Sequence, residues 1–427
     1  MTGQPVTRAP RLIDRRSAAV LCLLCVLIPL AVAVAICAIR AAVWHQSWPY
    51  SSFLPSTVTA FGDYYQVQGP WNVYQFHAST VGLGYYPAAY IPVAIIGAIS
   101  SNLQGDHWFS LAAFLSISVA AIIVLLWRRG PVVVVLGVTI FLLSYPTLFA
   151  ILSGNIEGWI GALLLVTFSL NARGHARAAA VVLGLAIAMK AVPVVFLPTL
   201  LVGCNWKRGR DVVLACVGSV VGATLVALVV LPGGLITSGG SGLRTIYDRM
   251  HAAGVTYQKL MIDTVAGTHY GNSFLNGIHA FFGQEVISSG QWGTITAMVI
   301  LVVIGSVFLV AWRDDLQIWI MAALCACAGC LAVPVSGDYR LLYFIPPIML
   351  LLGEEAFEVG WIPGAMILCL IVTPKPWGQR LPTPFTNAGV YVTPLLMMLF
   401  AAWVVFSILH RRRVIHKLPA GQLVRAR

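Results

Sequence analysis

Long apolar segments alternate with short polar stretches along nearly the whole chain. A membrane-spanning helix needs roughly 20 mostly apolar residues, and the pattern recurs often enough to predict about twelve of them. The predicted fold is therefore an all-α, polytopic bundle of transmembrane helices, with residues 1–427 forming a single domain. The predicted spans lie near 18–39, 87–102, 108–127, 131–150, 155–170, 179–203, 212–232, 291–311, 317–335, 340–353, 361–374 and 390–410.

Two polar stretches are longer than a turn, at about 44–86 and 233–290. We expect both to be extracytoplasmic loops, because the tails 1–17 and 411–427 carry the basic clusters typical of cytoplasmic ends. No polar segment is large enough to bury a core of its own. The chemistry of this protein must therefore occur in the bundle or in the two long loops.

Composition supports the membrane class, since 59% of the residues are hydrophobic and only 9% are Asp, Glu, Lys or Arg. The formal charge of +12 comes from short clusters that flank the predicted spans, which argues against nucleic-acid binding. We expect a multi-pass protein of the cell membrane with both termini cytoplasmic. Two clusters, Arg128-Arg129 and Arg173 to Arg177, fall on the wrong side in the simplest twelve-span tracing. Either segment 87–102 is re-entrant or the charge bias is imperfect here.

The chain has no pattern typical of a disulfide, metal or nucleotide site. All nine cysteines lie in or next to apolar segments. Cys325, Cys327 and Cys330 have no His or acid between them, which favours helix packing over metal binding. The glycine-rich run 233–242 lacks the Lys of a phosphate-binding loop. We therefore expect no metal and no cofactor.

Only 14 acids occur in 427 residues, so each can be weighed. Most lie in the predicted cytoplasmic tails and short loops, where a solvated charge explains them. Asp63 differs, because it lies in the first long loop among aromatic residues. Asp338 also differs, because it is wedged between two predicted spans beside Arg340, although a simple ion pair with Arg340 explains it equally well.

Glu157 and Lys190 are two further charges next to or inside predicted spans. Glu157 opens a span, where a helix N-terminus favours negative charge, although capping by Asn155 or Ser153 also explains this motif. Lys190 lies inside the predicted span 179–203, just before Pro193. Its ammonium either faces a polar cavity or an anion, or extends to the membrane surface.

The predicted outer side thus collects groups suited to a lipid-linked sugar. A carboxylate can act as a base, aromatic rings stack on sugars, amides bind hydroxyls, and cations bind phosphate. These residues are Asp63, His77, Tyr85, Tyr86, Asn272, Asn276, Lys190 and Arg340.

Several short segments resemble glycosyltransferase family 87, which has the C-type membrane fold and includes bacterial mannosyltransferases of envelope glycolipids. Two departures concern the last motif, where Tyr339 and Arg340 replace the frequent His, and the first loop, where Ala88 replaces a second Pro. The resembling segments are Phe61–Tyr65 with Tyr85–Tyr90, Ser153–Glu157, Ala188–Pro193, Gly271–Gly277, and Val335–Arg340 before Pro346-Pro347.

The resemblance implies a C-type bundle that transfers a hexose such as mannose, with inversion, from a polyprenyl-phosphate donor to a glycolipid or glycan acceptor on the extracytoplasmic face. It implies that Asp63 is the general base and that Arg340 and Lys190 stabilise the leaving phosphate. The remaining substrate-binding candidates are Asp338, Tyr339, Asn155, Glu157, Asn272, Asn276, Tyr85, Tyr86 and His77.

Two other functions stay open. A transporter or a flippase of lipid-linked sugars could use Lys190, Glu157 and Arg340 to line a path. Transporters commonly contain paired repeats, and no repeat is visible here, so the sequence favours the enzyme. A non-catalytic assembly partner is the third alternative.

Overall fold

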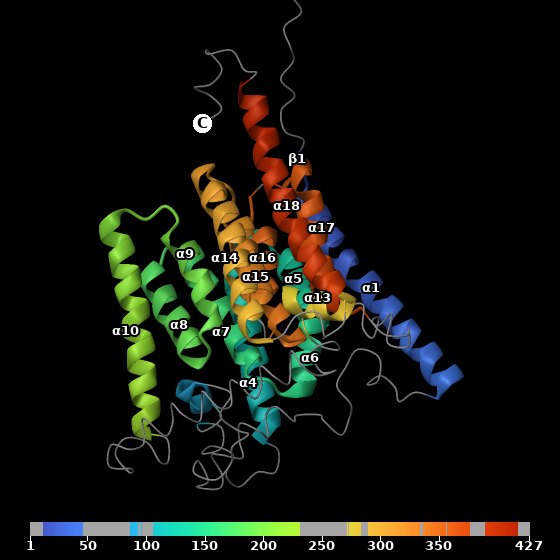
Figure 1. Ribbon diagram of the computed structural model, residues 1–427, viewed down its shortest axis with the longest axis horizontal. Coiled ribbons are helices and arrows are strands. Elements are labelled where there is room, and N and C mark those ends of the chain that lie inside the picture. Colours follow the sequence, from blue (N-terminus) through green and yellow to red (C-terminus); the bar gives the residue numbers. More distant parts are fainter. Residues whose placement is uncertain are drawn as a thin grey trace, which may run out of the picture.

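The structure is a computed structural model and is mostly helical (Figure 1). Within the ranges that it describes, the only ladder joins strands β1 (Leu12–Ile13) and β2 (Phe357–Glu358), which pair antiparallel. The prediction of a helical membrane bundle is confirmed. The described residues are 12–45, 86–92, 95, 106–230, 271, 273–282, 289–333, 336–355, 357–375 and 389–416.

Five of the described helices are long and apolar enough to cross a membrane. They are α1 (Arg15–Trp44), α4 (Asp106–Leu126), α10 (Trp206–Val230), α14 (Ser289–Arg313) and α18 (Gly389–His416). A sixth span results if α5 (Pro131–Leu143) and α6 (Tyr145–Ser153), which meet at an angle of 52°, count as one broken span. The number of twelve spans stays a prediction.

Shorter helices and 3₁₀ turns connect these long helices and pack between them. Several combine a 3₁₀ turn with a helix that begins at or near a proline, where the missing N–H is tolerated. These elements are η3 (Pro87–Ala89), η4 (Trp127–Arg129), α7 (Glu157–Ala172), α8 (Ala176–Met189), η5 (Val192–Phe196), α9 (Leu197–Leu201), α13 (Phe274–Phe282), α15 (Ile318–Leu331), η7 (Asp338–Phe344), α16 (Ile345–Leu352), η8 (Val359–Trp361) and α17 (Ile362–Ile371).

Two exposed tryptophans on one helix mark the thickness of the apolar layer. Trp108 near the start of α4 is 58% exposed, and Trp127 just after its end is 69% exposed. At about 1.5 Å per residue they lie about 28 Å apart, close to the hydrocarbon thickness of a bilayer. Because tryptophan favours the membrane interface, this spacing fits α4 crossing a bilayer with one ring near each surface.

One end of the bundle collects the basic residues and is called the basic end below. The turns after η4, α7, α9, α14 and α16 lie there, together with β1 and the last turns of α18 (Figure 1). Ion pairs tie these turns together: Arg129 with Glu355 at 3.3 Å, Arg412 with Asp314 at 2.6 Å, and Arg177 with Asp211.

The basic clusters at 128–129 and 173–177 both lie at the basic end, so the simplest tracing was wrong for them. The cause lies earlier in the chain: α1 ends and α4 begins at the end opposite the basic end, whereas the tracing placed a span between them (Figure 1). The segment 179–203 then forms two antiparallel pieces, α8 and η5–α9, instead of one span, so 173–177 and 204–211 lie at the same end. Lys190 between α8 and η5 has an extended backbone (φ −160°, ψ 133°). Pro193 follows three residues later, and its ring and missing N–H prevent α8 from continuing. Segment 87–102 falls largely outside the described residues.

The close contact between α8 and α10 depends on a glycine. A Cβ at Gly184 would lie 2.5 Å from the backbone oxygen of Cys216, whereas a Cβ at Gly218 on α10 would meet no atom within 4 Å. Backbone cannot move aside as a flexible side chain can, so α8 and α10 must separate to admit even one methyl group.

We expect Gly184→Ala to lower the stability of the protein by about 1–3 kcal/mol, the usual range for an overpacked contact. Gly218→Ala should be neutral or slightly stabilising, because Ala is the better helix former. Thermal unfolding of the full-length protein in detergent measures both. Equal midpoints for the two variants would contradict the close α8–α10 contact.

Candidate active site

A buried cluster of charges lies where α7, α8 and η7 meet, at the end of the bundle opposite the basic end. Glu157, the first residue of α7, is completely buried. Its Oε1 accepts a hydrogen bond from Lys190 Nζ at 2.6 Å, and its Oε2 accepts one from the Tyr343 hydroxyl at 2.9 Å. Arg340 Nε lies 3.7 Å from the same Oε1. One carboxylate therefore neutralises part of the charge of two cations.

The local sequence explains why Glu157 starts a helix here. Gly154 ends α6 with a left-handed backbone (φ 64°), which glycine adopts without strain. Asn155 Oδ1 then accepts a hydrogen bond from the backbone N–H of Glu157 at 2.9 Å. The capping role of Asn155 is thus present in the structure. Ser153 does not share it, because its buried hydroxyl has no hydrogen-bond partner in the described part of the chain.

Lys190 reaches Glu157 because α8 ends one residue earlier. Its side chain is 19% exposed, and its Nζ also lies 5.4 Å from the centre of the Tyr339 ring. An ammonium at this distance from an aromatic face is attracted by the ring quadrupole. Lys190 therefore lies between an acid and an aromatic ring at the edge of the cluster.

Arg340 is held by the turn that precedes it. Its backbone N–H donates to Gly337 O at 2.9 Å, and a Cβ at Gly337 would lie 2.7 Å from the Tyr339 ring. The Arg340 side chain is 1% exposed. Its Nε and Nη1 have no hydrogen-bond acceptor in the described residues, and 3.7 Å to Glu157 is too long for a hydrogen bond. Buried, unbonded N–H groups are costly and need an explanation.

Asp338 and Arg340 face different partners, so a simple ion pair between them does not describe this turn. The buried Asp338 Oδ2 accepts a hydrogen bond of 2.5 Å from the Tyr145 hydroxyl. Tyr145 begins α6, and its backbone N–H donates to Val372 O at 3.0 Å. This bond ties the start of α6 to the residues that follow α17.

Lys375, which the sequence analysis missed, belongs to the same region. It is buried, and its Nζ donates to Ile371 O at 3.2 Å and to Thr373 O at 2.8 Å. Burial lowers the pKa of Lys375 to about 7, while attraction by the carboxylate of Asp338 acts in the opposite direction. The only signal in the sequence is a lysine between two prolines directly after an apolar segment.

The charges of this region do not balance among the described residues. Two acids, Glu157 and Asp338, face three basic side chains, Lys190, Arg340 and Lys375. Protonation of Lys375 leaves one positive charge in excess. A buried site with excess positive charge and unbonded guanidinium N–H groups is suited to an anion.

The long polar stretch 233–290 approaches this region at one described point. Gly271 pairs with Gly337 in an isolated antiparallel bridge. Just beyond it, Asn276 is bound within the first turn of α13: its N–H donates to Ser273 Oγ, and its Oδ1 accepts from the same hydroxyl. Tyr86 is 40% exposed beside η3, which packs on α8 and α10.

The structure thus brings together six of the predicted site residues. They are Asn155, Glu157, Lys190, Asp338, Tyr339 and Arg340. Four others, Asp63, His77, Tyr85 and Asn272, lie outside the described residues.

The three clustered cysteines of α15 are buried and free, as expected for helix packing. In the part of the chain that the structure describes, no three His, Cys, Asp or Glu residues are placed to hold a metal ion.

Residues 84–334 match the family model described as Glycosyltransferase family 87, which is more than half of the chain. The chain belongs to glycosyltransferase family 87. The resemblance found in the sequence is therefore confirmed, and the protein is a membrane glycosyltransferase. No curated protein and no solved structure matches the chain. The matched range of family 87 includes Glu157 and Lys190, whereas Asp63, Arg340 and Lys375 lie outside it.

We expect Glu157→Gln to destabilise this family 87 protein strongly. The substitution keeps the shape of the side chain but leaves Lys190 and Arg340 without their acid, and removing one partner of a buried ion pair costs about 3–5 kcal/mol. In the double variant Glu157→Gln/Arg340→Met, part of the lost stability should return, because the uncompensated charge of Arg340 is removed. Thermal or denaturant unfolding of the full-length protein measures the three variants.

Glu355→Gln is the matched control. The Glu355 side chain is 83% exposed, and its Oε1 lies 3.3 Å from Arg129 Nη1. Breaking this exposed ion pair should lower the free energy of unfolding by less than about 1 kcal/mol. If Glu157→Gln were as mild as Glu355→Gln, or if Arg340→Met gave no recovery, the buried cluster would not stabilise the fold.

Proposed function

We propose that this enzyme transfers a sugar from a polyprenyl-phosphate donor to a glycolipid or glycan acceptor. The observation that carries the proposal is the buried guanidinium of Arg340, whose Nε and Nη1 lack acceptors in the described residues. A phosphate supplies acceptor oxygens of the right charge and geometry for a guanidinium. Membership of family 87 favours this enzyme over the transporter or flippase alternative.

The excess positive charge supports the same proposal. When the bond between the sugar and the phosphate breaks, the lipid phosphate gains a negative charge. Cations that are already in position stabilise this developing charge without reorganisation. In our proposal Lys190, Arg340 and Lys375 have this function. Glu157 holds two of these cations in place and is a positioning residue.

We propose Asp63 as the general base on the basis of the sequence and the family resemblance. Asp63 takes the proton of an acceptor hydroxyl, whose oxygen then bonds to the anomeric carbon. The bond from that carbon to the phosphate oxygen breaks, and the polyprenyl phosphate leaves with the electron pair, so the configuration inverts. An ordinary Asp pKa of about 3.9 keeps this base ionised at neutral pH.

The resemblance suggests which sugar is transferred, and the charge distribution suggests on which side of the membrane the transfer takes place. A hexose such as mannose would stack on aromatic residues, for which Tyr85, Tyr86 and Tyr339 are candidates, while Asn272, Asn276 and His77 bind hydroxyls. The basic end fits the cytoplasmic side of a cell membrane. The buried charge cluster at the other end then acts on the extracytoplasmic face, as the resemblance implies.

We expect Asp63→Asn to reduce sugar transfer by at least about 10²–10⁴-fold, the contribution of a general base. Asp315→Asn is the matched control, because Asp315 is exposed at the basic end and its left-handed backbone (φ 53°) also suits Asn. Purified full-length protein in liposomes, given a polyprenyl-phosphate hexose and a membrane-lipid acceptor extract, provides the assay. Full transfer by Asp63→Asn would overturn the assignment, and sugar uptake without a new glycosidic bond would favour transport.

We expect kcat/KM for the donor to fall as the pH rises through about 7, the pKa that burial gives Lys375. Below this pH the ammonium is charged and attracts the donor phosphodiester, which stays singly negative throughout. Above it Lys375 is neutral, and the loss of one charged contact should cost about tenfold. Lys375→Arg should remove the pH dependence while keeping activity, and Lys375→Met should be uniformly weak. A Lys375→Arg profile identical to the wild-type profile would contradict the role of Lys375.

A further inference from the structure

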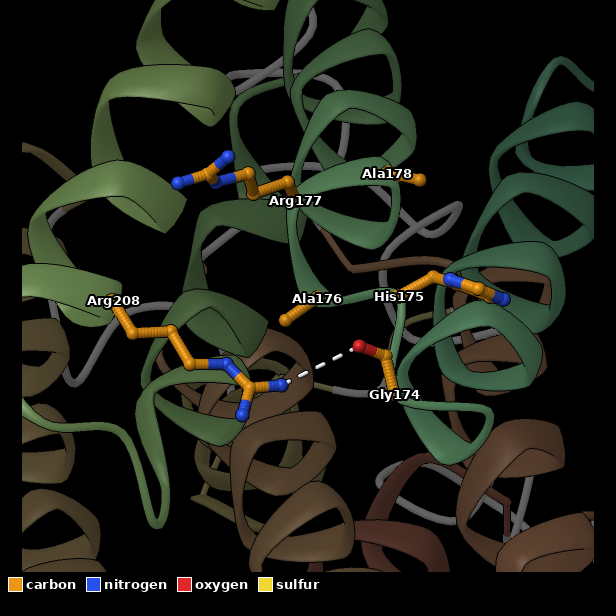
Figure 2. A pocket seen from close by; sticks show the side chains of 6 residues that line it. All are labelled: Gly174, His175, Ala176, Arg177, Ala178 and Arg208. Atoms are coloured by element: carbon orange, nitrogen blue, oxygen red, sulfur yellow. Dashed lines mark hydrogen bonds between the residues drawn. The ribbon is translucent and has the colours of Figure 1, made fainter.

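A hollow of about 580 Å³ lies at the basic end, between the α7–α8 turn and the start of α10. Its lining consists of Gly174, His175, Ala176, Arg177, Ala178 and Arg208 (Figure 2). The fourteen residues of α8 separate it from Lys190, about 21 Å at 1.5 Å per residue. It is therefore distinct from the candidate active site.

Positive charge is in excess around this hollow. Five basic residues occur in the two adjoining segments against one acid, Asp211. Arg177 and Arg210 pair with Asp211, and Arg208 Nη2 donates to Gly174 O at a long 3.4 Å. The guanidiniums of Arg177 and Arg208 lie on the same side of the first turn of α8, with Ala176 between them, while His175 points away (Figure 2). The basic residues are Arg173, Arg177, Lys207, Arg208 and Arg210.

The first turn of α8 adds backbone N–H donors to the side of the hollow that carries Arg177. The N–H groups at the start of a helix have no acceptor within the helix, and His175, which precedes α8, provides no side-chain cap. These amides carry the positive end of the helix dipole. Arginines from two helices and an uncapped helix start thus converge on a cavity that would suit an anion.

Exposed tryptophans place the hollow at the depth of the lipid headgroups. Trp206, at the start of α10, is 87% exposed and directly precedes Lys207 and Arg208. Trp127 and Trp312, at the same end, are 69% and 39% exposed and also precede arginines. Tryptophans followed by basic residues are typical of the membrane–water interface.

An exposed apolar surface continues from the hollow towards the middle of the bundle. On α8 it includes Val181 and Leu185, and on α10 it includes Leu214, Val217 and Val221. These two helices pack against one another along their length. Their exposed side chains can lie against acyl chains of a lipid whose headgroup occupies the hollow.

We propose that this hollow binds the phosphate headgroup of an anionic phospholipid, with the acyl chains along the exposed faces of α8 and α10. The phosphate would accept hydrogen bonds from Arg177, from Arg208 and from the first amides of α8. Basic pockets between transmembrane helices bind anionic lipids in this manner. The interfacial depth and the apolar surface favour a lipid over a phosphate ion from solution. The inference is independent of the transferase reaction.

The test measures the binding of phosphatidylglycerol to the purified full-length protein by native mass spectrometry, with phosphatidylcholine as the neutral reference. We expect a preference for phosphatidylglycerol that falls about 10- to 30-fold in the double variant Arg177→Gln/Arg208→Gln, since each surface basic residue adds appreciably to anionic-lipid binding. The double variant Arg128→Gln/Arg413→Gln removes the same charge from the basic end outside the hollow and should keep the preference. Arg177→Lys/Arg208→Lys keeps the charge but removes the paired guanidinium donors, so it should lose part of the preference.

Three outcomes would overturn the proposal. The first is an absence of preference for phosphatidylglycerol in the wild-type protein. The second is an equal loss in the two double variants, which would indicate a general surface-charge effect. The third is displacement of the lipid by soluble glycerol phosphate at the same concentration, which would show that a free phosphate is the ligand. If Arg177→Gln/Arg208→Gln failed to fold, the charge-conserving variant Arg177→Lys/Arg208→Lys and the competition with glycerol phosphate would still test the proposal.

Discussion

The buried carboxylate of Glu157 is the interaction on which the candidate active site depends. Taking a charged group out of water costs several kcal/mol, and here Lys190, Arg340 and Tyr343 together compensate it. They come from the residue that follows α8 and from η7, so the compensation exists only when both segments pack on the start of α7. The same contacts fix the cations before any substrate arrives, and preorganised charge is the main means by which enzymes stabilise a developing anion.

The two ends of the bundle use charge in different ways. At the basic end the ion pairs are partly exposed, and the acid of the Arg129–Glu355 pair is 83% exposed, so such pairs add little to stability. At the opposite end Glu157 and Arg340 have almost no exposed surface. The ion pairs at the basic end therefore join exposed turns, whereas the buried charges at the other end hold α7, α8 and η7 together. Helix α8, about 21 Å long, separates Lys190 from the basic residues of the α7–α8 turn.

Much of this arrangement could be predicted from the sequence, because membrane helices and their flanking charges leave strong local patterns. The motifs Ser153–Glu157 and Asp338–Arg340, and the single charge at Lys190, were found in this way. Three features depend on tertiary contacts instead. The partner of Lys190 cannot be read from its neighbours, Lys375 gives only a weak local signal, and the reversal inside 179–203 contains no polar loop to interrupt the apolar run. Asp63 lies outside the described residues, and its role stays a prediction.

The hairpin of α7 and α8 has a consequence for the assembly of the protein in the membrane. A three-residue turn at Arg173 to His175 joins the two helices at the basic end, and their free ends carry Glu157 and Lys190. Each charge alone would cost about 2.5–3.5 kcal/mol at the centre of a bilayer on the insertion scale. Opposite charges on adjacent helices of one hairpin can cross the hydrocarbon as a neutral pair. The contact between Glu157 and Lys190 thus also lowers the cost of placing Lys190 in the membrane.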